Sequence, residues 1–499
     1  MCMVFIFLKE VMKVKESIRK KVTKDAMENM GYIKELLKDN SDITFRHFCV
    51  SDRNVGLIYV DGLADKILLN DYVVKPMQLF NEDICSVEEI KNSIISASDV
   101  KLEADMASAV KNILSGESII FIDGVEFAYI IATRAWPNRG VSEPNSETTI
   151  RGSREGFVET IRFNTALLRR RIRDSRLKLE ATTVGVRSKT DVVITYIEDI
   201  VNTEALKELK EKINKIDIDA VLDSSYISQE IEEDRFSPFP QIQSTERPDV
   251  LAAALYEGRI GVIVDNTPFV LIVPTTLVNL MQSPDDYYSR WISASFIRLI
   301  RFFSIFLSLL LPALYISVTS FHNNIIPTKF AYSIAACREG VPFPAFVETI
   351  FMEISISLLL EAVARLPKAI GATVGIVGGL IIGDAAVGAG IISPIMVIIT
   401  GLTAITTFIA PNYEVTSSFR FIRIMLIILS SILGLYGVMI GMILSLVHLL
   451  KLRSFTVPYL APLVGPEFND LKDVFIRAPL KSFRRRPEYM KTGDKIRQK

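Results

Sequence analysis

The chain has 499 residues, enough for several domains, and its 57 basic and 57 acidic residues give a net charge of zero, so charge alone indicates no class of partner. Its cysteines are scattered and form no C-x-x-C pair, which argues against a disulfide framework or a zinc site. The average composition conceals a difference between two parts of the chain. Residues 1 to about 300 have the composition of a soluble protein, whereas 302–450 have that of a protein embedded in lipid.

Residues 1–29 are predicted to form an N-terminal extension. Their apolar run, MCMVFIFL, is too short to cross a membrane and is followed by no small-residue cleavage site, so no signal peptide is predicted. Met27 or Met30 is an alternative start of the chain.

The soluble half contains an internal repeat, in which a stretch ending at Thr133 matches one ending at Thr275 without a gap. Other aligned pairs are Gly116 with Gly258 and Asp123 with Asp265. Each copy predicts a helix, a glycine stop, a strand, a turn at Asp-Gly or Asp-Asn, and a returning strand. A chance match is the weaker explanation, because the register is shared throughout.

The repeat predicts two α/β subdomains of similar fold, at 30–150 and 185–300. A further apolar strand precedes each copy, GLIYVDG at 56–62 and VVITYIED at 192–199. We expect mixed sheets, because near-continuous apolar strands are typical of parallel sheets covered on both faces.

A basic helical connector is predicted over 151–184. Apolar residues recur there at helical spacing: Phe157, Ile161, Leu168 and Ile172. The favoured interpretation is a solvated basic helix that bridges the subdomains, and the alternative is a surface for phosphate, anionic lipid or an acidic partner. The candidate residues of such an interface are Arg151, Arg154, Glu155 and Arg162. No nucleic-acid partner is predicted, because no aromatic platform is interleaved with the arginines.

A transmembrane helical domain is predicted over 301–450. Four stretches are long enough to cross a hydrocarbon core of about 30 Å. They are 302–321, 369–386, 389–410 and 424–449. A fifth stretch, 345–363, is shorter and carries glutamates, so we expect it to dip into the membrane or to lie on its surface.

Both ends of this domain are predicted to be cytoplasmic. Arg290, Arg298 and Arg301 precede the first span, and a basic tail at 451–499 follows the last. The positive-inside rule places both flanks in the cytoplasm, which requires an even number of crossings. Five full crossings is the alternative, and it would leave the tail outside.

Four glycines at intervals of four residues predict that one helix face packs closely against another helix. They are Gly371, Gly375, Gly379 and Gly383. A glycine face lets a neighbouring backbone approach, which is how many helices associate in lipid.

Three acidic residues of the membrane domain are candidates for a pore or ion path: Glu353, Glu361 and Asp384. Ionisable groups in a membrane are costly and usually face a bundle interior or water. Glu361 can instead pair with Arg365 at i,i+4, and Asp384 can instead cap the following helix. Glu353 has no cation near it in the sequence, which favours a water-filled path.

No enzyme is predicted. The chain contains no G-x-x-x-x-G-K-[ST], H-E-x-x-H or G-x-S-x-G motif, and its histidines are far apart in unrelated contexts. We therefore predict no catalytic residue, no cofactor and no metal site.

Several long motifs, in order over about residues 40 to 490, resemble the A subunit of the spore germinant receptors, the GerA family. They include RGSREGFVETIRFN at 151–164, GRIGVIVDNTPFVLIVP at 258–274, REGVPFPAFVE at 338–348, IGATVGIVGGLIIG at 370–383 and SFTVPYLAPL at 454–463. PLKSFRRRP at 479–487 resembles the basic tail of the family.

The resemblance implies a nutrient-sensing receptor subunit in the inner membrane of the bacterial spore. Its implied partners are a permease-like B subunit and a lipoprotein C subunit. It also implies a homo-oligomer in contact with membrane lipid, which forms an ion-conducting path that triggers germination. The alternative is a non-conducting membrane scaffold that transmits the signal within the receptor. A secondary transporter is a weaker alternative, because the spans are few and show no inverted repeat.

Overall fold

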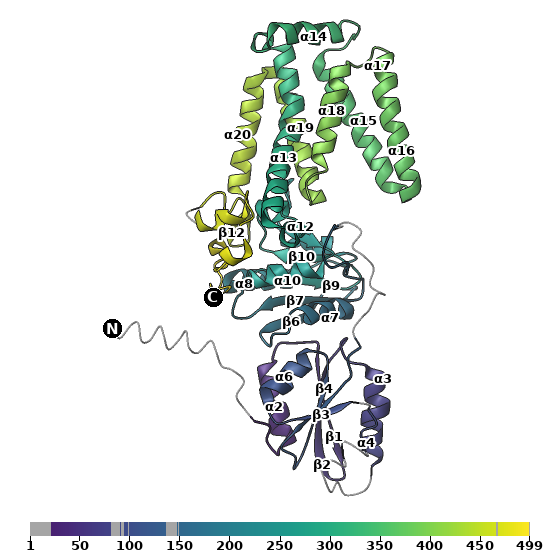
Figure 1. The fold of residues 1–499 in the computed structure, drawn as a ribbon, viewed down its shortest axis with the longest axis vertical. Helices are drawn as coiled ribbons and strands as arrows, with labels where there is room; N and C mark the ends of the chain where they lie inside the picture. Colours follow the sequence, from purple (N-terminus) through teal and green to yellow (C-terminus); the bar gives the residue numbers. More distant parts are fainter. Residues whose placement is uncertain are drawn as a thin grey trace, which may run out of the picture. The chain divides into compact units, whose positions relative to one another are not determined.

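The computed structural model describes residues 21–80, 90, 94–97, 99–135, 147, 149–465 and 468–498. The chain divides into two compact units. The sheet unit comprises residues 1–233, 242–274 and 483–499, and the helical unit comprises 234–241 and 275–482. The predicted fold class is confirmed, because two subdomains of sheet and helix precede a bundle of apolar helices (Figure 1).

The first subdomain is a five-stranded sheet in the order β1-β2-β4-β5-β3. Its strands are β1 (Ile43–Val50), β2 (Arg53–Val60), β3 (Val100–Glu103), β4 (Ser118–Ile122) and β5 (Ala128–Ile131). Its helices are α2 (Ala26–Leu36), α3 (Lys66–Leu69), the π-helix η1 (Asn70–Val74), α4 (Lys75–Leu79) and α6 (Met106–Leu114). Figure 1 shows α2 and α6 on one face of the sheet and α3 and α4 on the other.

The second subdomain repeats this topology, with strands in the order β6-β7-β9-β10-β8. Its strands are β6 (Leu177–Val184), β7 (Thr190–Ile197), β8 (Gln243–Thr245), β9 (Ile260–Val264) and β10 (Val270–Val273). Its helices are α7 (Ile161–Arg171), α8 (Thr203–Asn214), α9 (Ser224–Ile231) and α10 (Pro248–Tyr256).

The aligned glycines and aspartates of the repeat occupy the same places in both sheets. Gly116 and Gly258 follow α6 and α10 with φ angles of 92° and 88°, a conformation that favours glycine at a helix C-terminus. Asp123 and Asp265 follow β4 and β9 and begin the turns to β5 and β10. The sequence repeat is therefore a structural duplication.

Each aspartate also fixes the first helix of its own subdomain. Oδ1 of Asp123 accepts a hydrogen bond from the backbone N–H of Ala26, at 2.9 Å, and Oδ1 of Asp265 accepts one from Ile161, at 3.0 Å. Ala26 and Ile161 are the first residues of α2 and α7, where backbone N–H groups lack helical partners. Burial acts to raise the pKa of Asp123, but the hydrogen bond from Ala26, together with those from Asn54, outweighs it and lowers that pKa.

The expectation of mixed sheets is wrong, because every strand pair in the described part of the two sheets is antiparallel. The strands are near-continuously apolar because helices cover both faces of each sheet. All five residues of β4 are buried, and its four apolar residues belong alternately to the core beneath α2 and α6 and to the core beneath α3 and α4. Two-sided burial produces the pattern whatever the strand direction.

A buried ion pair joins the two subdomains. Arg169 of α7, which is 0% exposed, donates from Nε and Nη2 to both carboxylate oxygens of Asp42, at 3.0 and 2.9 Å. Nη2 also donates to Oδ1 of Asn40, at 2.9 Å. Residues 151–184, predicted to be a basic helical connector, contain α7 and the strand β6 of the second sheet, so they form part of the second subdomain. They contact the first subdomain through a buried arginine rather than as a solvated helix. The helix begins at Ile161, and Phe157 precedes it in the same core.

The helical unit is built from helices joined by short segments. The long helices are α13 (Trp291–Ser320), α15 (Ala345–Arg365), α16 (Lys368–Leu380), α18 (Pro394–Thr407), α19 (Tyr413–Leu433) and α20 (Leu435–Lys451). Shorter elements are α11 (Leu277–Met281), α12 (Asp285–Tyr288), α14 (Thr328–Arg338), the π-helix η4 (Ile381–Ala385), α17 (Ala386–Gly388), the strands β11 (Arg453–Ser454) and β12 (Val457–Pro458), and the 3₁₀ helices η3 (Asn323–Ile325), η5 (Phe468–Asp473) and η6 (Leu480–Ser482).

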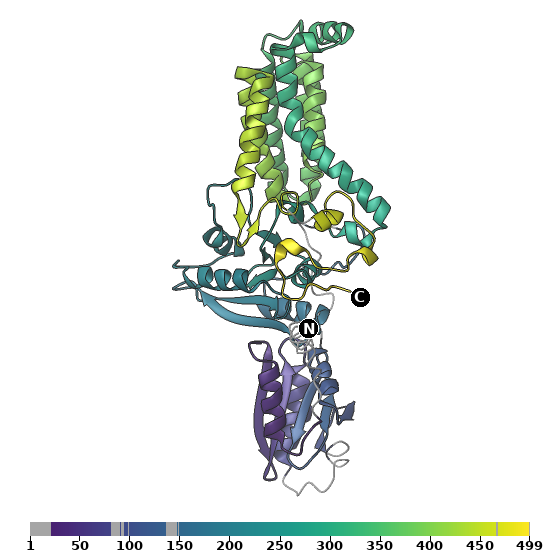
Figure 2. The same ribbon diagram turned by 90° about the vertical axis from the view of Figure 1, so that its left-hand side faces the viewer.

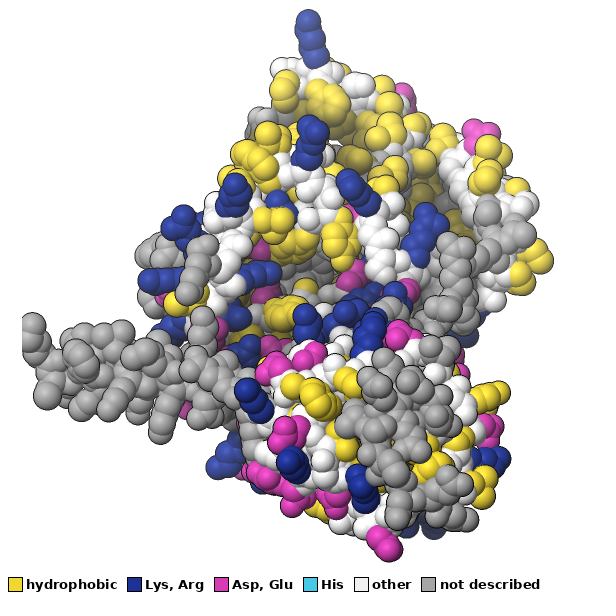
Figure 3. All heavy atoms as spheres, turned by 60° about the horizontal axis from the view of Figure 1, so that its bottom comes forward, with side chains coloured by type: hydrophobic (Ala, Val, Ile, Leu, Met, Phe, Trp, Pro, Cys, Tyr) yellow, Lys and Arg dark blue, Asp and Glu magenta, His cyan; other side chains and the backbone are white. Residues whose placement is uncertain are grey.

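Two of these helices, α13 and α19, are long and apolar enough to cross a membrane, with mean hydropathies of 2.1 and 1.6. The shorter helices α18 and α20 are also apolar. In the space-filling view, hydrophobic side chains gather over the helical unit, whereas acidic and basic side chains are interspersed over the first subdomain (Figure 3). This contrast is typical of a unit that faces lipid.

The single span expected at 424–449 is wrong, because the chain reverses at Gly434 between α19 and α20. Gly434 has a φ angle of 59°, and a Cβ built on it would lie 2.9 Å from the Cβ of Phe321. A Cβ on Gly437 would lie 2.0 Å from the Leu429 carbonyl oxygen, so the two helices touch through backbone. Only glycine allows so tight a reversal within an apolar run.

The long helices alternate in direction. In Figures 1 and 2, α14 lies at the end of the helical unit opposite α12 and β12. The start of α13 and the end of α20 therefore lie at the same end of the unit. Residues 345–363 belong to α15, a continuous helix of 21 residues, which corresponds to about 30 Å.

We expect Arg169→Ala to lower the free energy of unfolding by about 3–5 kcal/mol, because it leaves the buried carboxylate of Asp42 without a counter-charge. Urea unfolding of the purified full chain, followed by limited proteolysis, measures the change. The matched control is Arg187→Ala, which removes an exposed pair with Asp219 and should cost less than about 1 kcal/mol. Equal effects of the two variants would contradict the bridging role.

Candidate functional site

Charged residues are buried at three levels of the helical unit, each paired with a charge from another segment. The base cluster comprises Asp286, Arg298, Arg301 and Asp473. The middle pair comprises Glu353 and Arg423. The far cluster comprises Arg338, Glu348 and Ser393. Buried ionisable groups in an apolar bundle are the usual markers of function, so each of the three is a candidate site.

The base cluster holds the start of α13. Arg298 and Arg301 lie one turn apart on one face of the helix, and both contact Asp286, at 2.8 and 2.9 Å. Arg298 also pairs with Asp473, at 2.7 Å. The sequence assigned these arginines to a cytoplasmic flank, but they are buried and neutralised by aspartates.

Burial acts to raise the pKa of Asp286, but hydrogen bonds and charge from Arg301 and Arg298 outweigh it and hold that pKa below its ordinary value. The carboxylate is therefore ionised at neutral pH. Because its folded pKa is lowered, its pairing stabilises the fold above the unfolded pKa and is lost as the pH falls through the folded pKa.

The middle pair lies where four helices meet. Glu353 of α15 is 8% exposed, and Arg423 of α19 is 4% exposed. Nε and Nη2 of Arg423 donate to Oε1 of Glu353, at 3.0 and 2.5 Å. Nη1 donates to the hydroxyl of Thr407 in α18, at 2.9 Å, and to the carbonyl of Ser308 in α13, at 3.5 Å.

Glu353 has no cation near it in the sequence, which favoured a water-filled path, but in the structure its carboxylate is paired with Arg423. Its partner Arg423 is 70 residues away in the sequence and on another helix, so spacing along one helix could not reveal it. A signal was nevertheless present. Two opposite charges, each inside an otherwise apolar run, are expected to find one another when both runs are buried.

A seam of buried hydroxyl groups surrounds the middle pair. Its members are Ser308 on α13 and Thr400, Thr403 and Thr407 on α18. These hydroxyls donate to carbonyls of the preceding turn of their own helix. A cavity of about 10 Å³ beside Glu353 has room for roughly one water molecule. The seam is thus polar but closed.

The far cluster ties three helices together at the opposite end of the unit. The buried carboxylate of Glu348 in α15 accepts hydrogen bonds from Nη2 of Arg338 in α14, at 3.0 Å, and from the backbone N–H of Ser393, at 2.9 Å. Ser393 is the N-cap of α18. This cluster has the character of a structural clamp.

The other two candidate path residues lie outside these clusters. Glu361 pairs with Arg365 at i,i+4, with Nε to Oε1 at 2.7 Å, and both side chains are exposed. Asp384 is exposed within η4, and its side chain does not cap α17, whose N-cap is Ala385. The structure therefore does not bring Glu353, Glu361 and Asp384 together.

Two members of the glycine row contact α15 or lie near it. A Cβ built on Gly371 would lie 3.1 Å from the carbonyl oxygen of Val363, and one on Gly375 would lie 3.8 Å from a methyl group of the same residue. Gly371 is thus the position where the backbones of α15 and α16 come close.

The glycines farther along the row do not face α15. A Cβ on Gly379 would meet nothing within 4 Å, whereas one on Gly378 would lie 2.6 Å from Leu359. A Cβ on Gly383 would contact Val397 of α18 at 3.6 Å. The cause is geometric, because residues four apart are offset by about 40° on a helix of 3.6 residues per turn. The row therefore forms no continuous contact with the described residues of this chain.

Among the candidate interface residues, Glu155 is engaged within the chain. Its carboxylate accepts hydrogen bonds from Arg170 and Arg171 of α7, at 2.9 and 2.8 Å. Arg151 and Arg154 are exposed in the segment before α7.

Arg162 lies at the junction of the subdomains. Its Nη1 donates to the carbonyl of Ser41 at 3.4 Å, and its Nε lies 4.0 Å from a carboxylate oxygen of Asp61. Like Arg169, it faces the first subdomain. Sequence spacing identified the basic helix but not which of its arginines would be buried.

Comparisons with known proteins give one consistent result. A family model described as Bacillus/Clostridium GerA spore germination protein matches residues 31–489. The chain is 40% identical over 489 residues to the uncharacterized membrane protein YfkQ of Bacillus subtilis (strain 168), covering 98% of this chain and 95% of that protein. It is 39% identical over 471 residues to spore germination protein GerLA of Bacillus cereus, covering 94% and 96%.

A solved structure is also similar. The crystal structure of the N-terminal domain of the A subunit of the Bacillus megaterium spore germinant receptor GerK3 is 32% identical. The match has a TM-score of 0.42 and covers 51% of this chain and 97% of that chain.

We expect Asp286→Asn to lower stability by about 3–5 kcal/mol at pH 7, because it leaves two buried arginines with less counter-charge. The difference from wild type should be constant above about pH 5 and shrink below about pH 4, where the carboxylate of the unfolded wild-type chain becomes protonated while that of the folded chain is still ionised. Thermal unfolding of the purified full chain at several pH values measures this, with Asp219→Asn as the exposed control. A difference that persists unchanged to pH 3 would contradict the assignment.

We expect Gly371→Leu and Gly379→Leu to fail in different ways. Gly371→Leu should destabilise the single chain by about 1–3 kcal/mol, because the leucine collides with the backbone of α15. Gly379→Leu should leave the single chain stable but impair assembly between chains more than the control Ile376→Leu does. Thermal unfolding and the oligomer fraction on cross-linking separate these effects. Normal assembly of Gly379→Leu would exclude that glycine from a contact between copies.

Proposed function

This chain belongs to the Bacillus/Clostridium GerA spore germination protein family, and on that premise we propose that it is the A-type subunit of a receptor that triggers spore germination in response to a nutrient. The match covers both units of the structure, and relatives of nearly full length are named spore germination proteins. Its partners would be a permease-like B subunit and a lipoprotein C subunit. Arg151 and Arg154 are candidates for contacts with them.

The helical unit would lie in the membrane, and specifically in the inner membrane of the spore. A relative that is 40% identical is named a membrane protein, and α13 and α19 have the length and composition to cross a bilayer. The alternation of the long helices supports placing both flanks of the unit on one side. The basic residues near those flanks favour the cytoplasmic side, which in a spore is the core.

We propose further that the subunits oligomerise and contribute an ion path, with the middle pair of Glu353 and Arg423 at its constriction. The observation that carries this proposal is the position of the pair, buried among α13, α15, α18 and α19. A buried ion pair adds little net stability compared with apolar residues of the same size. Its presence at the centre of a bundle is therefore better explained by function.

The seam suggests how such a path would work. With Glu353 bound to Arg423, the constriction is neutral and admits roughly one water molecule. A shift of α15 relative to α19 would separate the pair and expose a carboxylate to water. The hydroxyls of Ser308, Thr403 and Thr407 could then turn from backbone carbonyls toward a hydrated cation.

A non-conducting scaffold that transmits the signal remains the second candidate. The small size of the cavity beside Glu353 favours it for the conformation described here. Ion flux through the purified oligomer in liposomes separates the two functions, because a scaffold would assemble normally without conducting.

We expect Glu353→Gln to reduce stability, by about 3–5 kcal/mol, and to change cation selectivity, because it leaves Arg423 buried without a counter-charge. The double variant with Arg423→Gln should recover stability but not selectivity. Flux and reversal potential in liposomes measure selectivity, and thermal unfolding measures stability. The control, Glu361→Gln, breaks only an exposed pair. If wild type conducts and the double variant is indistinguishable from it, the ion path runs elsewhere.

A further inference from the structure

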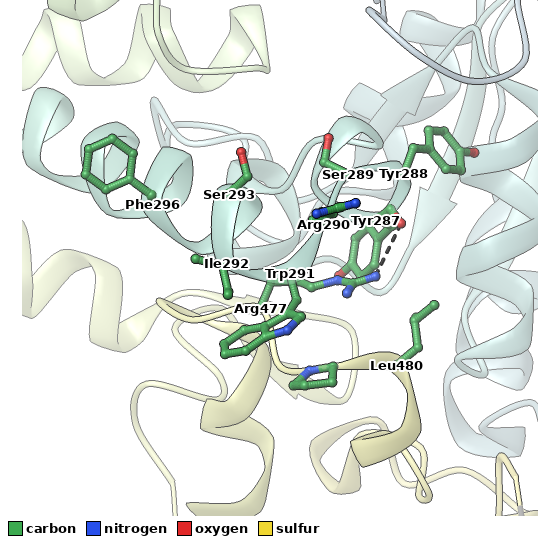
Figure 4. Close-up of a pocket in the computed structure, with 11 residues that line it drawn as sticks. Tyr287, Tyr288, Ser289, Arg290, Trp291, Ile292, Ser293, Phe296, Arg477 and Leu480 are labelled. Atoms are coloured by element: carbon green, nitrogen blue, oxygen red, sulfur yellow. Dashed lines mark hydrogen bonds between the residues drawn. The ribbon is translucent and has the colours of Figure 1, made fainter.

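An open groove of about 1010 Å³ lies at the start of α13 (Figure 4). It adjoins the base cluster through Tyr287, whose ring stacks against Arg298. The turn from α12 into α13 forms one wall, and the segment around η6 forms the other. Its apolar lining includes Trp291, Ile292, Phe296, Pro479 and Leu480. Three of these side chains are markedly exposed: Trp291 at 43%, Ile292 at 65% and Phe296 at 65%.

The charge of the groove is wholly positive. Its charged lining residues are two arginines, Arg290 and Arg477, and none of the described residues that line it is acidic. Arg290 is exposed at the mouth, and Arg477 is only 4% exposed. The groove is therefore complementary to an anion.

Arg477 is a buried cation that pairs with no carboxylate in the described part of the chain. Its Nη2 donates to the carbonyl oxygen of Tyr287, at 3.2 Å, and its guanidinium lies 5.7 Å from the centre of the Tyr287 ring. Its buried Nε has no hydrogen-bond partner among the described residues. The neighbouring Arg298, by contrast, pairs with both Asp286 and Asp473. An uncompensated buried guanidinium is costly unless a ligand supplies the anion.

The groove continues into a surface that faces lipid. The 30 residues of α13 correspond to about 45 Å, more than the roughly 30 Å of a hydrocarbon core, so its first turns extend into the interfacial layer. Trp291 and the tyrosines before it are the residue types enriched there. Farther along α13, the exposed Phe303 and Phe306 extend the apolar surface. An occupant must therefore combine an anionic group with a long apolar one.

We propose that this groove binds an anionic phospholipid, with its phosphate on Arg477 and Arg290 and an acyl chain along Trp291, Ile292 and Phe296. The proposal rests on the membrane placement of the helical unit given above. The bound lipid would also stabilise the base cluster through Tyr287. The carbonyl oxygen of Tyr287 accepts a hydrogen bond from Arg477, and its hydroxyl donates one to Asp473, at 2.6 Å. Free phosphate would leave the apolar wall uncovered, and a second copy of the chain would have to bring a carboxylate to Arg477.

The tryptophans allow a direct test. The chain has two, Trp136 and Trp291, so Trp136→Phe leaves Trp291 as the only one. Phosphatidylglycerol with brominated acyl chains should then quench its fluorescence at a lower mole fraction than brominated phosphatidylcholine. Arg477→Gln should weaken this preference about tenfold, since a hydrogen bond to a charged group is worth about one such factor. Arg290→Gln, at an exposed position that leaves the fold intact, should weaken it about fivefold.

The matched control is Arg453→Gln, which removes an exposed arginine at the start of β11 outside the groove. An unchanged preference in that variant supports the site. Equal quenching by the two lipids, or an equal loss in Arg453→Gln, would overturn it. So would reversal of the quenching by millimolar glycerol phosphate, which would identify a free-anion site. Protein that floats with vesicles but is not quenched would indicate a second copy over the groove, whereas protein that does not float would contradict the membrane placement itself.

Discussion

The need to neutralise charge away from water is the constraint on which the helical unit depends. An unpaired ion in apolar surroundings costs several kcal/mol, so a buried guanidinium or carboxylate must be met by an opposite charge from another segment. Arg298 meets Asp473, Glu353 meets Arg423, and Glu348 meets an arginine of α14. Apolar side chains let helices slide past one another, whereas these pairs allow one register.

The sheet unit applies the same constraint to a duplicated fold. In each subdomain an aspartate, after β4 or β9, accepts a hydrogen bond from the first backbone N–H of α2 or α7. Each copy therefore fixes its first helix by its own hydrogen bond. The two copies are then joined by a contact that neither contains alone, the buried pair of Arg169 with Asp42. The connector between the copies has thus become part of the core of the unit, which makes the pair of subdomains one compact body.

The proposed functions depend on whether a buried charge is fully neutralised by an opposite charge. The middle pair of Glu353 and Arg423 is fully neutralised, and the seam of hydroxyls around it is closed. Conduction would require that this pair separate, so the same interaction that registers α15 against α19 would also control the path. In the groove at the start of α13 neutralisation is incomplete, because Arg477 faces no carboxylate in the described residues, and a lipid phosphate would complete it.

Local spacing was sufficient to predict the duplication, the glycine stops at Gly116 and Gly258 and the family resemblance. It offered the pair of Glu361 with Arg365 only as an alternative to a path residue. Each of these depends on residues that are neighbours in the chain or on one turn of a helix. The antiparallel sheets, the reversal at Gly434 and the partner of Glu353 were decided only when distant segments packed together. Burial on two faces produces the same apolar strand in either direction, and a charge finds its partner through space. Spacing along the chain therefore predicts neither the strand direction nor the partner of a buried charge.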